Sequence, residues 1–285
     1  MIRKRFGQHF LAPAWADKVV DAIAPDPGDR FLEIGPGPGA LTLRLAPRVA
    51  RLTAVEVDRD LARDLAPRLP PNAEIVTADF LDFDPAPLLA AGPVRVAGNL
   101  PYNLSTPILF KLLAAADPKR GQPPFFANKG DSPLFSDATV MLQREVADRL
   151  AARPGTKDYG VLTIFMTARA DVERVLTLPP GAFRPAPKVH SAVVRLTFKP
   201  DVVPPELRDI FERMVRSMFT QRRKTLGNAL RPFAESLGAS ALAALHAAGI
   251  DPTRRPETLD VTELVSLASA FEAAGPEPPP RRGAA

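Results

Sequence analysis

Residues 31–40 read Phe31-Leu32-Glu33-Ile34-Gly35-Pro36-Gly37-Pro38-Gly39-Ala40, a short apolar run that passes directly into a glycine loop. The run predicts a buried strand, and the glycines let a ligand approach the backbone closely. Gly35, Gly37 and Ala40 also satisfy the relaxed dinucleotide fingerprint, which places an acidic residue about 20 positions further on. Glu56 occupies that position. This unit therefore indicates a cofactor that contains adenosine, with Glu56 on its ribose hydroxyls, but it does not say which cofactor.

Strand-like and helix-like segments alternate from this unit onward, which is typical of a mostly parallel sheet with helices on both faces. The expected strands are residues 31–34, 52–57, 74–77, 94–97 and 139–142. The expected helices are residues 40–46, a segment that ends at Leu65, residues 108–116 and residues 145–152. Residues 161–166 and 192–198 are rich in β-formers with no clear helix between them, so we expect an antiparallel pair at the edge of the sheet. The fold class is therefore α/β.

The pattern changes after Lys199-Pro200, and from Glu206 onward apolar residues recur at helical spacing. We expect residues 1–200 to form the α/β domain and residues 201–272 to form a small α-helical domain. Residues 273–285 are rich in Pro, Arg and Gly and predict a disordered tail. The segment Lys119–Ser136 carries several Gly and Pro residues and predicts a long inserted loop, to which we assign no chemistry.

Composition limits the classes of protein that this chain can belong to. Its 285 residues are 46% hydrophobic, which is enough for one large domain and a small one. It has no cysteine, which excludes disulfides, thiolate metal sites and cysteine nucleophiles. No stretch approaches the about 20 apolar residues of a membrane span, and the basic start has no apolar run behind it. These features predict a cytoplasmic protein.

The formal charge is +5, and the sequence pI is about 9.7. Basic residues gather at Arg3-Lys4-Arg5, at Arg222-Arg223-Lys224 and at Arg254-Arg255. One such cluster is ordinarily a solvated face. Together they favour a polyanionic partner.

Asn99-Leu100-Pro101-Tyr102 follows the expected strand at 94–97 and suits chemistry on an exocyclic amino group of a base. The nitrogen of that group is a poor nucleophile, because its lone pair is delocalised into the ring. Asn99 Oδ1 and the carbonyl of Leu100 can accept its two hydrogens and favour a more reactive, pyramidal nitrogen. Pro101 would stiffen the turn, and Tyr102 would stack on a flipped-out base. The alternative is an ordinary strand-to-helix turn, where Asn and Pro are common.

Asp79 and Phe80 place a carboxylate and an aromatic ring just past the strand at 74–77. Asp79 can accept a hydrogen bond from an adenine amino group, which a dinucleotide site does not usually need at this point. In open parallel sheets, ligands bind outside the carboxyl ends of the strands. We therefore expect Gly35, Glu56, Asp79 and Asn99, one from each strand, to converge on one site.

With these residues in place, the chain resembles the ribosomal RNA adenine N6-dimethyltransferases. It is most similar to the bacterial branch that dimethylates two adjacent adenosines near the 3′ end of 16S rRNA and is linked to kasugamycin sensitivity. The matching segments are residues 4–11, 33–39, 56–58, 78–79, 99–103, 143–147, 183–189 and 221–226. The segment Lys119–Ser136 is longer than the family pattern.

The resemblance implies a Rossmann-like class I methyltransferase sheet and S-adenosylmethionine as methyl donor. The implied cofactor contacts are His9, Leu11, Gly35, Gly37, Glu56, Asp79, Phe80 and Asn99. The implied base site consists of Asn99, Leu100, Pro101 and Tyr102, with Phe183 as a second ring against the base. The sulfonium is already an activated donor, so the chemistry needs placement and no metal.

The resemblance also implies a partner and a substrate. Arg222, Arg223 and Lys224 would contact the rRNA backbone, with sequence read from unpaired bases. The implied substrate is a partly assembled small subunit, and the family suggests a monomer.

Three alternatives stay open. The first is an enzyme of the macrolide-resistance type, which methylates one adenosine of 23S rRNA; residues 183–189 and 221–226 favour the small-subunit branch. The second is a non-catalytic ribosome assembly factor, against which the intact turn at 99–102 and the complete glycine loop argue. The third is a nucleotide-dependent oxidoreductase, which Asp79 and Asn99 disfavour.

Overall fold

The computed structural model describes residues 9–116 and 135–274 of the chain. Motif residues 4–8, the basic cluster Arg3-Lys4-Arg5, most of the expected insertion (residues 119–134) and the tail from residue 275 lie outside these ranges. The described residues form two compact units. One consists of the chain up to Ala151 together with Arg169–Pro200, and the other of Ala152–Ala168 together with the chain from Asp201. The sequence analysis placed residues 152–168 in the α/β domain, because it set the boundary at residue 200. In the structure these residues belong to the second unit.

Within the described part of the chain, the first unit contains a seven-stranded sheet with the strand order β4-β3-β2-β5-β6-β9-β7. The strands β2 (Arg30–Ile34), β3 (Arg51–Glu56), β4 (Ala73–Thr77), β5 (Val94–Asn99) and β6 (Phe135–Gln143) run parallel. At one edge, β9 (Ser191–Phe198) pairs antiparallel with both β6 and β7 (Ala170–Leu178). The Rossmann-like α/β class expected from the sequence is confirmed.

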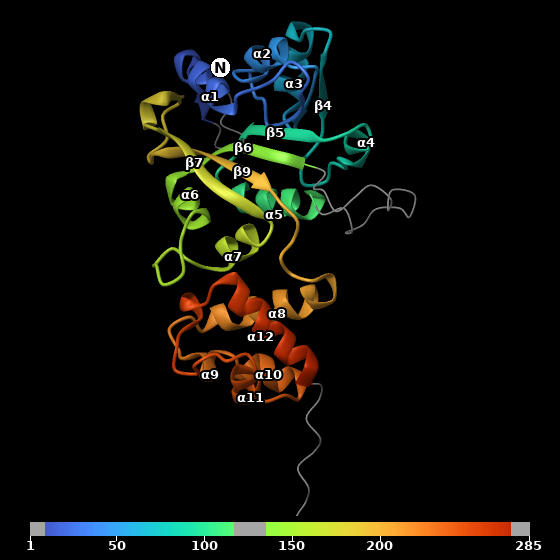
Figure 1. The fold of residues 1–285 in the computed structure, drawn as a ribbon. Coiled ribbons are helices and arrows are strands. Elements are labelled where there is room, and N and C mark those ends of the chain that lie inside the picture. Colours follow the sequence, from blue (N-terminus) through green and yellow to red (C-terminus); the bar gives the residue numbers. More distant parts are fainter. Residues whose placement is uncertain (1–8, 117–134, 275–285) are drawn as a thin grey trace, which may run out of the picture. The chain divides into compact units, whose positions relative to one another are not determined.

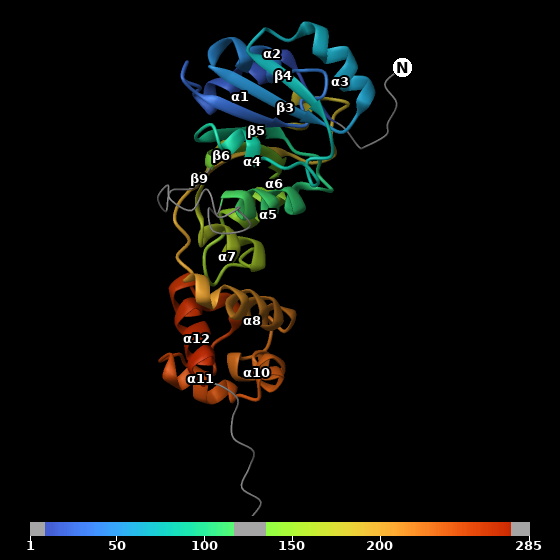
Figure 2. The ribbon, with the colours of Figure 1, turned by 90° about the vertical axis from the view of Figure 1, so that its right-hand side faces the viewer.

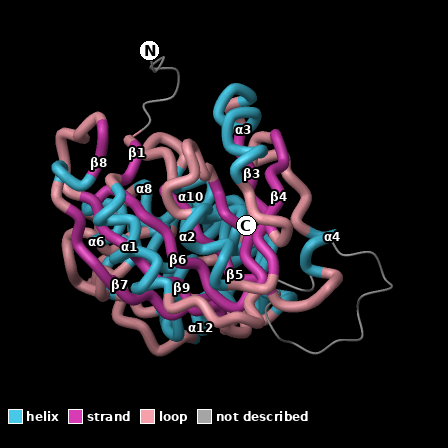
Figure 3. Tube along the Cα trace, turned by 90° about the horizontal axis from the view of Figure 1, so that it is seen from above, coloured by secondary structure: helices cyan, strands magenta, loops and turns pink. Residues whose placement is uncertain are grey.

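Helices cover both faces of this sheet, as Figures 1 and 2 show. On one face lie α1 (Pro13–Ile23), α2 (Thr42–Leu45) and α3 (Arg59–Leu65), and on the other lie α5 (Ser105–Ala116) and α6 (Arg144–Leu150). A short helix, α4 (Ala86–Leu89), precedes β5. Two further short strands, β1 (Phe10–Leu11) and β8 (Phe183–Arg184), pair antiparallel with each other (Figure 3).

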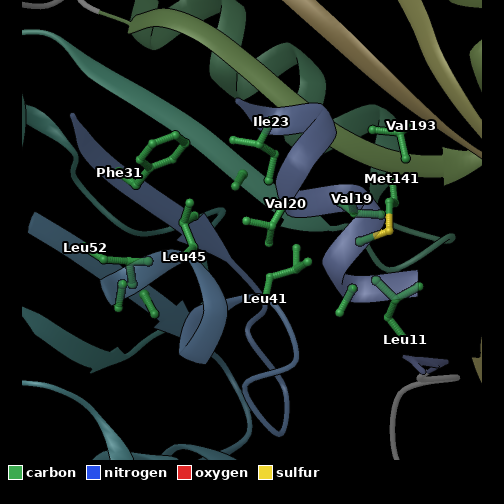
Figure 4. Packing of buried hydrophobic residues seen from close by; sticks show 14 of the residues in the cluster. Leu11, Val19, Val20, Ile23, Phe31, Leu41, Leu45, Leu52, Met141 and Val193 are labelled. Atoms are coloured by element: carbon green, nitrogen blue, oxygen red, sulfur yellow. The ribbon is translucent and has the colours of Figure 1, made fainter. Parts of the chain in front are cut away.

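One hydrophobic core cluster of the first unit lies between α1 and the sheet (Figure 4). Val20 and Ile23 of α1 pack with Phe31 of β2, Leu45 of α2 and Leu52 of β3, and each of these side chains is at most 2% exposed. Burial of such side chains contributes about 1.5–3 kcal/mol each relative to leaving them in water. This layer fixes β2, and with it the start of the glycine loop.

Arg95 on β5 ties the end of α1 to the sheet. Its guanidinium donates to the carbonyl oxygens of Ile23 and Ala24, and to the carboxylates of Asp29 and Asp137. Burial disfavours the charged guanidinium, but the hydrogen bonds that it donates to the two carboxylates outweigh this effect and raise the pKa of Arg95. A cation at a helix C-terminus also complements the helix dipole.

The expected strand at residues 161–166 is wrong, because these residues form the helix α7 (Val161–Thr167). The edge strand that pairs with β9 is β7 instead, and it starts at Ala170. Residues 163–166 of α7 are all buried, so no polar face marks the helical period. A short apolar run of this kind cannot be assigned to a helix or a strand by periodicity alone.

The second unit is helical. Besides α7 it contains α8 (Arg208–Thr220), α9 (Leu226–Ala229), α10 (Arg231–Leu237), α11 (Ala241–Ala247) and α12 (Val261–Ala274). The face of α8 that the sequence predicts is buried, including Phe211 and Met214. Residues 152–168 join these helices through Tyr159, which is 2% exposed and donates a 2.7 Å hydrogen bond to the carbonyl oxygen of Leu259.

Candidate active site

A pocket opens at the carboxyl ends of β2, β3 and β5, in the first unit. It collects most of the site residues that the sequence predicts: His9, Gly35, Gly37, Glu56, Asp79, Phe80, Asn99, Leu100, Pro101 and Tyr102. Apolar side chains such as Ile34, Val55 and Ile108 complete the lining. A pocket that is mostly apolar, with a few convergent polar groups, is typical of a small-molecule site.

The glycine loop adopts backbone conformations that favour glycine. Gly35 has φ +66° and Gly37 has φ +56°, in the left-handed region that L side chains rarely adopt. A Cβ on Gly37 would also lie 3.0 Å from the ring of Phe10. At Gly35 the nearest atom to such a Cβ is the carbonyl oxygen of Asn99, at 3.9 Å. The loop conformation therefore favours glycine at both positions, and at Gly37 a side chain would also crowd the ring of Phe10.

Glu56 holds this loop at the end of β3. Its Oε2 accepts a 2.9 Å hydrogen bond from the backbone N–H of Gly37, and its Oε1 accepts one of 3.0 Å from the N–H of Asp58. Burial raises the pKa of Glu56, and these backbone hydrogen bonds act in the opposite direction. Glu56 is the last residue of β3, and its carboxylate is thus held in a fixed position in the lining of the pocket.

Glu33 is a buried acidic residue to which the sequence assigned no role. It lies in β2, is 1% exposed, and its Oε2 has no hydrogen-bond partner among the described residues. Burial, helped by the nearby carboxyl group of Glu56, raises its pKa to about 7. The sequence did contain a signal for this buried group, because Glu33 is an acidic residue in the middle of an otherwise apolar strand. Because burial penalises the charged carboxylate, this carboxyl group can hold a proton near neutral pH.

The turn after β5 places Asn99 and Leu100 in the lining of the pocket. Asn99 Nδ2 donates a 2.8 Å hydrogen bond to the carbonyl oxygen of His9, which leaves Oδ1 as the acceptor of that amide. The N–H of Leu100 donates to the carbonyl oxygen of Met141 on β6, so the peptide is held from behind. Ser105 Oγ donates to the carbonyl oxygen of Pro101 at 3.1 Å and closes the turn. Asn99 and Leu100 are therefore held on a fixed backbone, and their role as an acceptor pair stays a prediction.

Tyr102 is held at both ends of its side chain. Its hydroxyl shares a 2.7 Å hydrogen bond with Ser191 Oγ, and its ring stacks on the ring of His9 with centroids 5.5 Å apart and an angle of 29° between the planes. Burial raises the pKa of Tyr102, so the phenol is neutral at physiological pH. The ring can therefore contact a nucleobase by stacking, and the protonated hydroxyl does not act as a general base.

Asp79 and Phe80 follow β4 at the rim of the pocket. The carboxylate of Asp79 is exposed and accepts a 2.8 Å hydrogen bond from the N–H of Leu81. Phe80 is 5% exposed, and Lys111 lies over its ring while donating to the carbonyl oxygen of Leu81. Burial lowers the pKa of Lys111. An adenine-sized group at this rim would thus contact the exposed carboxylate of Asp79 and the apolar ring of Phe80.

Leu11 and Phe183 do not line the pocket. They face each other in the β1–β8 pair, where Leu11 is 6% exposed and Phe183 is 0% exposed. Both belong to the hydrophobic core beneath α1. The contact of Leu11 with a cofactor and that of Phe183 with a base stay predictions, and in this structure the ring that stacks on Tyr102 is His9.

The basic cluster Arg222-Arg223-Lys224 lies in the second unit and divides into two roles. Arg222 Nη1 donates to the carbonyl oxygen of Lys157 at 2.7 Å, and Nη2 donates to that of Thr156 at 2.9 Å. Arg222 therefore holds a loop of its own unit. Arg223 and Lys224 are exposed, and they are the cationic groups of this cluster that a polyanion can reach.

The described ranges contain neither a metal-binding cluster nor a membrane-spanning helix. No group of three or more His, Cys, Asp or Glu side chains in residues 9–116 and 135–274 is placed to hold a metal ion. None of the helices in those ranges is long and apolar enough to span a membrane.

Comparison with known proteins places the chain among enzymes that modify ribosomal RNA. The family model described as "Ribosomal RNA adenine dimethylase" matches residues 1–272. A protein of Acidithiobacillus ferrooxidans named "Ribosomal RNA small subunit methyltransferase A" is 43% identical over 94% of this chain and 94% of its own length. A protein of the same name from Geobacter metallireducens is 44% identical over 96% of each chain.

Two solved structures agree in fold with this chain. A dimethyladenosine transferase from Plasmodium falciparum superposes with a TM-score of 0.74 at 25% identity, over 93% of this chain and 98% of that one. The 23S rRNA methyltransferase ErmE superposes with a TM-score of 0.65 at 27% identity, over 92% of this chain and 99% of that one.

Proposed function

The chain belongs to the ribosomal RNA adenine dimethylase family, and from this membership and the geometry of the pocket we propose how it acts. It is an rRNA methyltransferase of the small-subunit branch, which dimethylates N6 of two adjacent adenosines near the 3′ end of 16S rRNA. The family and its Rossmann-like sheet imply the use of S-adenosylmethionine.

The observation that supports this mechanism is the hydrogen bond from Asn99 Nδ2 to the carbonyl oxygen of His9 at the end of β5. With Nδ2 bound to the carbonyl oxygen of His9, Asn99 Oδ1 can accept one N6 hydrogen, while the carbonyl oxygen of Leu100 accepts the other. Both bonds draw the amino group out of conjugation, which localises its lone pair. S-adenosylmethionine, when bound, supplies an activated methyl group on a sulfonium. The protein's own part is then positioning and polarisation of the amino group.

The residues of the pocket fit that cofactor. We assign the ribose hydroxyls to the carboxylate of Glu56, the adenine amino group to Asp79, and the adenine ring to the apolar surface of Phe80. The positive φ angles of Gly35 and Gly37 and the absence of side chains there allow the close backbone approach that such a ligand needs. These groups follow the carboxyl ends of neighbouring strands, where open α/β sheets bind ligands.

We assign the partner to rRNA in a partly assembled small subunit, and we expect the enzyme to act as a monomer in the cytoplasm. Arg223 and Lys224 are exposed and would contact phosphates, whereas Arg222 is engaged within its own unit. An enzyme acting on 23S rRNA is disfavoured, because the relatives at 43–44% identity carry a small-subunit name.

A methyl-transfer assay tests this function. Isotopically labelled S-adenosylmethionine is incubated with unmethylated small subunits and, separately, with unmethylated large subunits, and the modified base is identified by mass spectrometry. N6,N6-dimethyladenosine in the small subunit alone supports the assignment. Label in the large subunit would assign the enzyme to the macrolide-resistance type. No label in either, with the cofactor bound, would leave a non-catalytic assembly factor.

A further inference from the structure

Lys111 is a cation beside the pocket to which the proposed mechanism gives no role. It lies on α5, one helical turn after Ile108, which lines the pocket. Its Nζ donates a 2.6 Å hydrogen bond to the carbonyl oxygen of Leu81, 30 residues earlier in the chain. The same Nζ lies over the ring of Phe80, 5.4 Å from the ring centroid. One side chain of α5 therefore makes two contacts with the turn that carries Asp79 and Phe80.

The turn after β4 is also held by hydrogen bonds of its own. Asp79 Oδ1 accepts the 2.8 Å hydrogen bond from the N–H of Leu81, and the Asp79 carbonyl oxygen accepts hydrogen bonds from the N–H groups of Asp82 and Phe83. Leu81 thus binds the Asp79 carboxylate with its N–H and binds Lys111 with its carbonyl oxygen. A single residue therefore connects the carboxylate of Asp79 to α5.

The place of β4 in the sheet explains why a contact from α5 matters here. β4 is an edge strand, and it pairs with β3 on one side only. Its residues 73–76 are only partly buried. Segments with few buried contacts open more easily than the core of a domain. The contacts of Lys111 supply support to the turn from a second element.

The Lys111 ammonium also lies near the acidic side chains of this turn. Burial lowers the pKa of Lys111, and the nearby carboxylates of Asp82, Asp79 and Asp84 act in the opposite direction. A cation within about 6 Å of the centroid of an aromatic ring is attracted to the face of that ring. Lys111 therefore combines a hydrogen bond, a ring contact and a compensating charge at one turn.

We propose that Lys111 is a positioning residue for the adenine end of the cofactor, because it holds the turn that carries the Asp79 carboxylate and the Phe80 ring. This inference rests on the proposed function, which assigns the adenine to those two residues. Lys111 is not one of the described residues that line the pocket, so it acts through the turn. It therefore sets the cofactor affinity and the preference for adenine, and it leaves the methyl-transfer step at saturating cofactor unchanged.

Three variants test this role. Lys111→Met keeps an apolar stem but removes the donor and the cation, whereas Lys111→Arg keeps both. Lys18→Met is the matched control, because Lys18 lies over the ring of Trp15, 4.5 Å from its centroid, and neither of these residues lines the pocket.

The main measurement is ligand binding to the full-length protein by calorimetry. The ligands are S-adenosylhomocysteine and S-inosylhomocysteine, in which an oxygen replaces the amino group of the adenine. Both are thioethers, so the loss of the cation at residue 111 does not act on a sulfonium charge. Methyl transfer to unmethylated small subunits at saturating S-adenosylmethionine and urea unfolding are measured in parallel.

We expect Lys111→Met to raise the dissociation constant of S-adenosylhomocysteine by about 2- to 12-fold, the range for the loss of one hydrogen bond. The preference of the wild type for the adenosyl over the inosyl compound should fall by a similar factor, because the Asp79 carboxylate is no longer held. The kcat and the urea midpoint should stay near the wild-type values. Lys111→Arg and Lys18→Met should bind both thioethers as the wild type does.

An unchanged preference in Lys111→Met would overturn the proposal, because the Asp79 carboxylate would then not depend on Lys111. So would a fall in kcat that matches the loss of affinity, or a failure of Lys111→Arg to restore binding. A wild type that binds both thioethers equally would refute the assignment of Asp79 to the adenine amino group, and this inference with it. A wild type that prefers the adenosyl compound but fails to methylate small subunits would refute the proposed function, while the binding data would still decide the role of Lys111.

Discussion

The side-chain amide of Asn99 donates a 2.8 Å hydrogen bond to the backbone carbonyl oxygen of His9, which lies 90 residues earlier in the chain. The bond joins the segment that precedes α1 to the turn that follows β5. It also occupies Nδ2, so Oδ1 remains as the acceptor of this amide. The polarity of the candidate catalytic side chain is thus set by a backbone atom from a distant part of the sequence.

Asn99→Ala should abolish methyl transfer, because it removes both the acceptor for N6 and the bond to His9. We expect a loss of at least about 100-fold in kcat, the size seen when one preorganised electrostatic contact is deleted. The affinity for S-adenosylmethionine should fall only moderately. Asn99→Asp keeps an acceptor but places a charged oxygen against the carbonyl oxygen of His9, so it should not restore the wild-type activity. Wild-type turnover in Asn99→Ala would exclude the proposed role.

Tyr102→Ala should cost about 1–3 kcal/mol of base stacking, which appears in kcat/KM for the subunit. Tyr102→Phe keeps the ring and removes only the hydrogen bond to Ser191 Oγ, so it should cost about 0.5–1.5 kcal/mol at most. Steady-state kinetics on unmethylated small subunits compare the two variants. If Phe and Ala had the same effect, the hydroxyl and not the ring face would be the important group.

Glu33 should make the stability of the protein depend on pH. Its pKa is about 7 in the folded state against an ordinary value of 4.5, so between these values the folded state holds a proton that the unfolded state has released. The stabilisation is fully present below about pH 4.5 and is lost as pH rises to about 7, for a total of about 3 kcal/mol.

Urea unfolding of the wild type and of Glu33→Gln from pH 5 to pH 8 checks this. The free energy of unfolding of the wild type should fall relative to that of Glu33→Gln as pH rises, because the amide does not titrate. Parallel pH profiles of the two proteins would show that Glu33 is ionised throughout.

The basic cluster of the second unit should separate into a stability role and a binding role. Reversing the charge of Arg223 and Lys224 together should weaken RNA binding and reduce the slope of log K against log salt by about 0.7–0.9 for each phosphate that is no longer neutralised. Arg222→Ala should instead lower the stability of the loop at Thr156–Lys157, whose carbonyl oxygens it binds. Binding measured at several salt concentrations, together with proteolysis of the loop, distinguishes the two. An unchanged salt slope in the double variant would place the RNA elsewhere.

The sequence by itself determined the parallel sheet, the glycine loop and the residues that end its strands. These features depend on local chemistry: an apolar run predicts a buried strand, glycine permits a positive φ, and the carboxyl ends of parallel strands share one edge. For this reason Glu56, Asp79 and Asn99 could be assigned to one site from the residues alone. The helix at 161–167 could not be predicted, because the burial of residues 163–166 removes the polar face that reveals a helical period.

Only the tertiary structure decided which groups meet across long separations. It placed His9 against Tyr102, bound Arg222 to its own unit, and buried Phe183 opposite Leu11. It also buried Glu33 and so raised the pKa of its carboxyl group. The sequence could not show this, because desolvation depends on every element packed around that side chain. Such contacts depend on packing between segments far apart in the chain, and no local pattern of residues encodes them.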